Sequence, residues 1–171
     1  EQIIANGTIK EVFKTDGLTL HLSAFVPDGN NSVILEMYTE GNKNCRVDLN
    51  LWSQTGNGSR NDFGEENGIC WVSRSLDTPD LDWPSHIVMA MKTLGSEGRI
   101  FTLKPSAKVY VVITLCTNHD TPDYSATAIQ NASSFSVKSI QELRTSNNEW
   151  WKNFWAESLV EIGDSTMEKY Y

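Results

Sequence analysis

Short stretches in which apolar and polar residues alternate fill the first two thirds of the chain. Within 18–25, four apolar residues recur at every second position, which is the period of a β-strand with one buried face. The turn signal Asp16-Gly17 joins this run to an alternating run over 8–13, as in a β-hairpin. Further runs of this kind, separated by turn residues, cover 33–39, 45–52, 69–76, 86–94, 99–103 and 108–117.

This pattern predicts a mainly β domain, built as an antiparallel β-sandwich. Each strand has one apolar face, and a second sheet is the expected cover for such faces. No helical period separates the strands, which argues against a parallel sheet with crossover helices. The polar, glycine-rich stretch 54–68 and the acidic, proline-bounded stretch 78–84 are expected to be loops.

The character of the chain changes after residue 118. Ser136 or Ser139 is expected to open a helix that runs to about Ser158, since Ser139 and Glu142 have the spacing of a capping box. A second capping signal at Ser146 suggests an interruption of this helix. The segment 159–162 is predicted to be extended.

A third capping box, Ser165 with Glu168, begins another predicted helix only a few residues before Tyr171. Because so short a helix is not stable alone, we expect the chain to be cut from a longer protein. The predicted division is a β-sandwich over 1–135, a linker helix over 136–158, and the start of a truncated following domain over 159–171.

Charge and hydropathy exclude several classes of partner. The formal net charge of −8 over 171 residues, without a basic cluster, argues against nucleic acid. No apolar stretch has the length needed to cross a membrane.

Three cysteines, Cys45, Cys70 and Cys116, lie in predicted strands. Their spacing fits no zinc site, so they are interpreted as buried small residues, although one disulfide stays open for a secreted chain. The three histidines are too scattered to indicate a metal site or a catalytic triad, and no cofactor is predicted.

Four aromatic residues, Trp150, Trp151, Phe154 and Trp155, would form a broad face on a helix. Such a face most often packs against a neighbouring sheet or domain, and an exposed sugar-stacking surface is the alternative. The stretch 148–158, which reads NEWWKNFWAES, together with Ile162, Asp164 and the terminal MEKYY, resembles a junction in bacterial glycoside-hydrolase-like proteins.

In those proteins an N-terminal super-sandwich domain passes through a linker helix into an (α/α)6 barrel. The architecture is similar to glycoside hydrolase families 65 and 95, and to an uncharacterised relative common in gut Bacteroidetes. The resemblance implies a secreted or periplasmic protein whose catalytic carboxylates belong to the barrel. It therefore implies a non-catalytic domain here, with the four aromatic residues docking its own C-terminal barrel.

Two acidic loops are the candidates for contact with a ligand. Asp62, Glu65 and Glu66 lie in the first, and Asp80, Asp82 and Trp83 lie in the second. Either loop could reach over a carbohydrate cleft or hold calcium through its carboxylates. Solvation of acidic loops is the ordinary alternative.

Three functions follow from these observations. The first is a scaffold domain of a glycoside-hydrolase-like protein, which could lend a loop to the carbohydrate cleft. The second is a free-standing carbohydrate-binding module, which predicts exposed coplanar rings such as Trp52, Trp71 and Trp83. The third is an adhesin-like interaction domain, which predicts a large exposed apolar patch.

Overall fold

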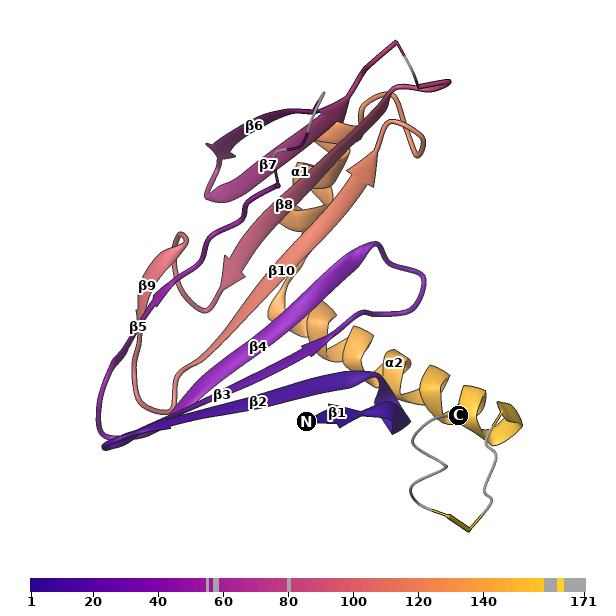
Figure 1. The fold of residues 1–171 in the computed structure, drawn as a ribbon. Helices are drawn as coiled ribbons and strands as arrows, with labels where there is room; N and C mark the ends of the chain where they lie inside the picture. Colours follow the sequence, from indigo (N-terminus) through magenta and orange to yellow (C-terminus); the bar gives the residue numbers. More distant parts are fainter. Residues whose placement is uncertain (55, 57–58, 80, 159–162, 165–171) are drawn as a thin grey trace.

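The computed structural model describes residues 1–54, 56, 59–79, 81–158 and 163–164 (Figure 1). One antiparallel sheet has eight strands in the order β1-β2-β3-β4-β10-β8-β7-β6, and a second sheet pairs β5 with β9. The strands are β1 (Gln2–Ile3), β2 (Thr8–Thr15), β3 (Leu18–Phe25), β4 (Ser32–Gly41), β5 (Cys45–Asp48), β6 (Ser59–Glu66), β7 (Ile69–Leu76), β8 (Ser85–Leu94), β9 (Ile100–Leu103) and β10 (Lys108–Thr117). The helices are the short 3₁₀ helix η1 (Ile4–Asn6), α1 (Tyr124–Ser134) and α2 (Val137–Ser158).

The predicted fold class is confirmed: the chain is mainly β, antiparallel and followed by a C-terminal helix. The small sheet lies on one face of the large sheet, and both helices lie on the other face (Figure 1). The helices thus take part of the covering role that the sequence pattern assigned to a second sheet.

Strand β10 shows how the alternation of side chains builds both layers. Val109 and Val111 face the small sheet, in a cluster with Phe101 and Leu103 of β9. Tyr110 and Val112 point the other way, toward the helices. All four side chains are buried, because β10 lies near the middle of the large sheet with a layer on each face.

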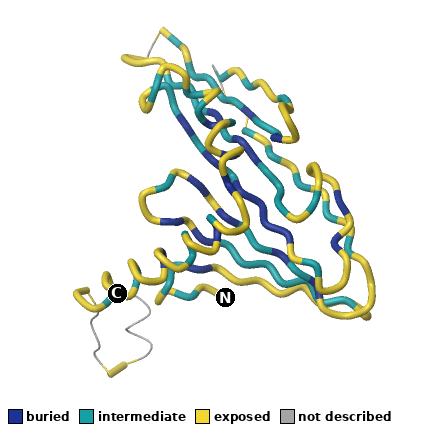
Figure 2. Tube along the Cα trace, turned by 180° about the vertical axis from the view of Figure 1, so that it is seen from behind, coloured by how far each residue is buried: buried dark blue, intermediate teal, exposed yellow. Residues whose placement is uncertain are grey.

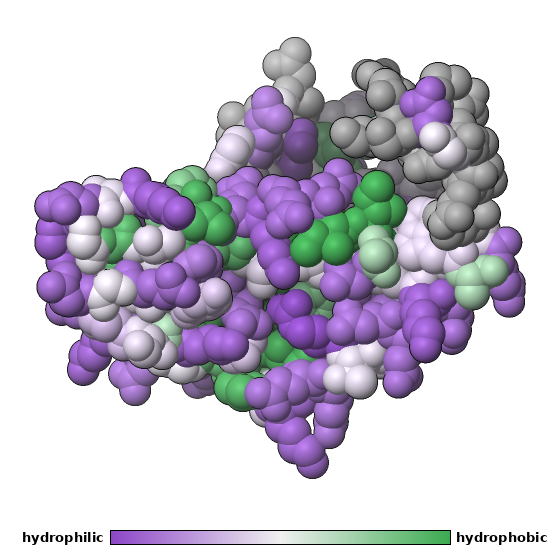
Figure 3. Space-filling model, turned by 90° about the horizontal axis from the view of Figure 1, so that it is seen from below, coloured by the Kyte–Doolittle hydropathy of each residue, from purple (hydrophilic) through white to green (hydrophobic). Residues whose placement is uncertain are grey.

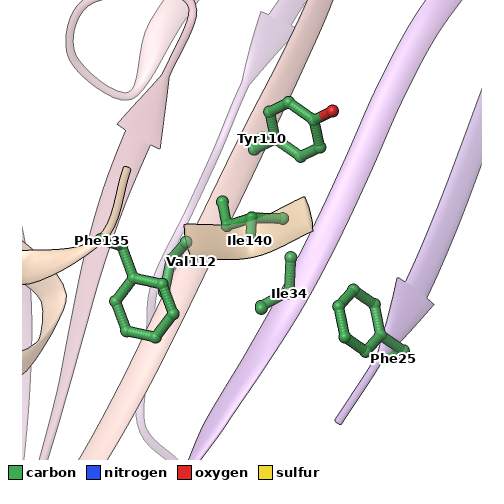
Figure 4. Packing of buried hydrophobic residues seen from close by; sticks show 6 residues of the cluster. All are labelled: Phe25, Ile34, Tyr110, Val112, Phe135 and Ile140. Carbon is green, nitrogen blue, oxygen red and sulfur yellow. The ribbon is translucent and has the colours of Figure 1, made fainter. Parts of the chain in front are cut away.

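The helices cover two buried clusters. Ile140 of α2 packs against Phe25, Ile34, Tyr110, Val112 and Phe135 (Figure 4). Ala128 and Ala132 of α1 lie against β7, β8 and β10 with none of their surface exposed. The view from behind shows buried strands under helices whose outer sides are exposed (Figure 2).

The prediction of a loop over 54–68 is wrong, because residues 59–66 form strand β6 at the edge of the large sheet. An edge strand has a partner on only one side, so its residues can be polar without breaking a core. The turn into β7 is made by Asn67 and Gly68, both with positive φ (51° and 75°), as in a two-residue hairpin. The strand predicted over 45–52 ends at Asp48.

The sequence analysis did not predict α1. The helix predicted to open at Ser136 or Ser139 is α2, which the structure describes over Val137–Ser158. Ser136 is the cap, because Ser136 and Ser139 exchange backbone-to-hydroxyl hydrogen bonds of 2.9 and 3.1 Å. The interruption near Ser146 is absent from the described helix, where the Ser146 hydroxyl donates to Leu143 O at 3.1 Å. The extended segment 159–162 and the capping box at 165–168 lie outside the described residues.

Candidate functional site

The four aromatic residues of α2 form one stacked cluster. The rings of Trp150 and Phe154 are nearly parallel, with centroids 5.4 Å apart, and those of Trp151 and Trp155 stack at 5.8 Å. Edge contacts of 4.9 to 5.6 Å connect the two pairs. The four rings thus form two stacked pairs: Trp151 with Trp155, called the inner pair below, and Trp150 with Phe154, called the outer pair.

The inner pair, Trp151 and Trp155, packs on the N-terminal segment of this same chain. Trp155 Nε1 donates a hydrogen bond to Ile4 O at 2.9 Å. Trp151 lies against Gly7, whose φ of +59° and missing side chain make room for the indole. Asn147, buried one turn earlier, donates to Asn6 O at 3.1 Å.

The outer pair, Trp150 and Phe154, is 39% and 40% exposed. Of the four residues predicted to dock a following domain, two are thus already used inside this domain. Docking of another domain by the outer two stays a prediction.

The acidic candidates are not gathered into one site. Asp62, Glu65 and Glu66 lie along β6, where alternate residues face opposite sides of the sheet. Asp82 and Trp83 lie in the 77–84 connection, and Trp83 is 73% exposed. Asp80 lies outside the described residues. No hydrogen bond or ion pair joins the two sets within the described part of the chain.

A groove runs between β6, β7 and the segment that follows β5. This edge groove has a volume of about 640 Å³, and its lining includes Asn50, Trp52, Asn61, Phe63, Glu65 and Arg99. Leu49 and Leu51 of the same segment pack inward against the core, whereas Trp52 is 66% exposed. Phe63 is 81% exposed although it lies within a strand.

Polar groups lie along the edge groove beside these rings. Asn61 Nδ2 donates to Ser53 O at 3.0 Å, while Asn61 Oδ1 accepts no hydrogen bond from the described residues. Arg99 Nη1 lies 3.0 Å from Asp48 Oδ1, which holds the guanidinium in place. The Cys70 thiol donates a long hydrogen bond to Glu65 Oε2, with 3.9 Å between Sγ and Oε2. Burial and the nearby Glu65 raise the pKa of the Cys70 thiol, so it stays protonated.

Trp52, Trp71 and Trp83 make no ring contact with one another among the described residues, although Trp71 also lines the edge groove. Trp71 packs partly buried against the cluster under α1, and its ring covers Gly64. A Cβ atom at Gly64 would lie 2.6 Å from Trp71 Cζ2, so the strand pair needs glycine there. Trp71 is therefore a packing residue.

A second groove, of about 700 Å³, lies between α2 and strands β2, β3, β4 and β10. At its centre, Glu36 accepts from Lys108 Nζ at 2.6 Å and from Arg144 Nη2 at 3.2 Å. Arg144 also lies over the ring of Phe25, 4.4 Å from its centroid. His21 stacks on Tyr38 at 4.5 Å and contacts Glu40. Because these charged groups are already paired, this groove fastens α2 to the sheet.

Replacing Glu36 with glutamine should lower the free energy of unfolding by about 1 kcal/mol, since the half-exposed Lys108 and the partly buried Arg144 both lose their carboxylate. The hydrogen bond to Glu36 raises the pKa of Lys108 above its ordinary 10.5. Its stabilisation is therefore present below pH 10.5 and is lost as the pH rises through the raised pKa. Urea unfolding should show the difference between wild type and E36Q shrinking above that pH.

Glu142→Gln is the matched control, because Glu142 is 66% exposed and, among the described residues, forms an ion pair with Lys138 alone. That variant should change the stability by less than about 0.5 kcal/mol. An E36Q variant as stable as E142Q would contradict the role given to Glu36.

The cysteines and histidines form no assembled centre. All three cysteines are free, and burial raises the pKa of the Cys116 thiol. Among the described residues, no three His, Cys, Asp or Glu side chains come together to hold a metal ion. Ser85 Oγ lies 3.3 Å from His119 Nε2, a pair that the sequence analysis missed. Asp120 does not complete a triad, because its Oδ2 accepts from Thr117 N and Oγ1, which lowers the Asp120 pKa.

The described helices include none that is long and apolar enough to cross a membrane. On the face seen from below, apolar side chains form separate patches within a mostly hydrophilic surface (Figure 3). That face does not have the single large apolar patch expected of an adhesin-like domain.

Comparison with known proteins identifies the fold and leaves the family open. No family model matches the chain, and no curated protein matches it at the significance required. Among solved structures, the chain is similar to one titled "Putative kojibiose phosphorylase from human microbiome", with a TM-score of 0.60 and 14% sequence identity. The match covers 89% of this chain and 22% of that chain. The resemblance to a domain of glycoside-hydrolase-like proteins is thereby confirmed at the level of the fold.

Proposed function

We propose that the chain is a non-catalytic N-terminal domain of a larger carbohydrate-active protein, in which it scaffolds a following helical domain. The observation that carries this proposal is the fold similarity, which covers most of this chain and 22% of a much longer phosphorylase-like chain. A region of that relative size fits one domain among several.

The outer ring pair of α2 supports the same proposal. Trp150 and Phe154 lie on the side of the helix that the sheet leaves open, and they are already stacked on each other. A preformed aromatic pair loses little conformational freedom on docking, which suits a constant interdomain contact. The division of the chain at 135 and 158 belongs to this proposal.

The proposal is tested on the full-length protein encoded by the gene. The coding sequence should continue beyond Tyr171 into repeating amphipathic helices. In that protein, the double variant Trp150→Ala/Phe154→Ala should uncouple the two domains. Calorimetry should then show two separate unfolding transitions in place of a coupled one, and proteases should cleave faster near residue 160.

Trp52→Ala/Phe63→Ala is the matched control, since it removes the same two ring types from exposed positions on the other face of the sheet. The control should unfold like the wild type. A stop codon directly after Tyr171, or an α2 double variant that behaves like this control, would refute the scaffold role.

A further inference from the structure

The edge groove holds two large rings that contribute little to the packing of the domain. Trp52 and Phe63 are 66% and 81% exposed, although Leu51, next to Trp52, packs partly buried against the core. Neither ring stacks on another ring among the described residues. Two open aromatic faces on one groove form a surface on which a flat, partly apolar ligand can lie.

The polar groups of the groove are held in place before any ligand arrives. The hydrogen bond from Asn61 to Ser53 fixes this amide in the wall of the groove, with its Oδ1 buried. Asp48 orients the guanidinium of Arg99, and Glu65 lies on the same side of β6 as Phe63. Guanidinium and carboxylate groups beside an aromatic face are donors and acceptors that bind pairs of vicinal hydroxyls.

The charge of the groove selects among ligand classes. Its one guanidinium is already paired with Asp48, and Glu65 supplies a negative charge. The whole chain carries a net charge of −8, which disfavours phosphates and other anions. The volume of about 640 Å³ lies within the range that small-ligand sites have, roughly 300–1,000 Å³.

We propose that the edge groove binds a neutral saccharide, with pyranose rings stacked on Trp52 and Phe63 and their hydroxyl groups bound by Glu65 and Arg99. The apolar C–H face of a pyranose matches an aromatic face, and its equatorial hydroxyls reach the polar groups at the sides. This site does not depend on the scaffold role, because the groove and the outer ring pair of α2 lie on opposite faces of the large sheet.

The helix-side groove is the weaker candidate for such a ligand. Its Glu36, Lys108 and Arg144 already bind one another, and its Tyr38 ring is covered by His21. A ligand there would have to break contacts that fasten α2, whereas in the edge groove Glu65 is exposed and 47% of the Arg99 side chain is exposed.

The test is titration of the 171-residue chain with maltotriose, cellotriose and mannotriose, each up to about 10 mM, followed by tryptophan fluorescence and calorimetry. At least one of these saccharides should bind. Trp52→Ala should weaken that binding by about 10-fold or more, and Phe63→Ala should act in the same direction. Trp83→Ala removes a similarly exposed indole (73%, against 66% for Trp52) from outside the groove and should leave the affinity unchanged.

Circular dichroism of each variant must match the wild type, which separates loss of binding from loss of fold. Absence of binding by all three saccharides would overturn the proposal, as would binding that W52A and F63A leave unchanged. A chain that binds no saccharide and forms dimers sensitive to F63A would assign the groove to a protein interface instead. These binding experiments do not affect the result for W150A/F154A, which tests the scaffold role. The failure of the saccharide proposal and the failure of the scaffold proposal can therefore be told apart.

Discussion

Replacing Ile140 with alanine should lower the free energy of unfolding by about 3 kcal/mol. Ile140 is the side chain by which the first turns of α2 enter the core, and none of its surface is exposed. Its removal leaves a cavity between Phe25, Ile34 and Val112 (Figure 4), and the β-sheet cannot close around the space. Urea unfolding followed by circular dichroism measures the change.

Val137→Ala provides the control on the same helix. It also shortens a β-branched apolar side chain to alanine, but Val137 is 41% exposed. Its effect should stay within about 0.5 kcal/mol. Equal unfolding midpoints for I140A and V137A would mean that α2 is not packed on the sheet as described.

Replacing Gly7 with alanine should cost about 3 kcal/mol, the second large effect, through two separate causes. Gly7 has a φ of +59°, a conformation that an L-residue adopts only with strain. Its new Cβ atom would also lie 2.6 Å from Cε2 of Trp151, so the indole would have to leave its place on the N-terminal segment. Near-ultraviolet circular dichroism should report the displaced ring, and urea unfolding should report the stability.

Gly29 separates the two causes. It has a similar φ of +65°, but no atom lies within 4 Å of the position that a Cβ would take. Gly29→Ala should therefore show only the backbone strain, about 1–2 kcal/mol, with an unchanged aromatic spectrum. If both variants lose the same stability, the contact between Trp151 and Gly7 contributes nothing.

The β-strands could be predicted where burial imposes alternation. The stretch 108–117 is buried on both faces and agrees with β10 at both ends. Strand β6 could not be predicted from apolar alternation, because an edge strand with polar residues resembles a loop. The Asn67-Gly68 dipeptide was the signal that indicated a hairpin there.

Helix α1 was missed because its buried side is made of alanine. Ala128 and Ala132 lie one turn apart and let the helix approach the sheet closely, but small residues give only a weak apolar period. The spacing of four positions between Ala128 and Ala132 was nevertheless a signal of a helix.

The candidate site shows a similar division. The aromatic cluster of α2 could be predicted from helical spacing alone, since Trp151 and Trp155 lie one turn apart. The sequence could not predict which of these rings face inward, because their orientation depends on contacts with Ile4 and Gly7 at the opposite end of the chain. The grouping of Trp52 with Phe63 likewise depends on the pairing of β6, which the sequence analysis did not predict.

The contact between Trp155 and Ile4 joins residues separated by 151 positions in the chain. A ribosome makes the N-terminal segment first, yet the contact of that segment with Trp155 cannot form until the last turn of α2 has left the exit tunnel. The hairpins from β2 to β4 can pair much earlier, because their partners are close in sequence. During synthesis, Ile4 and Gly7 thus stay exposed to chaperones and proteases until nearly the whole domain has been translated.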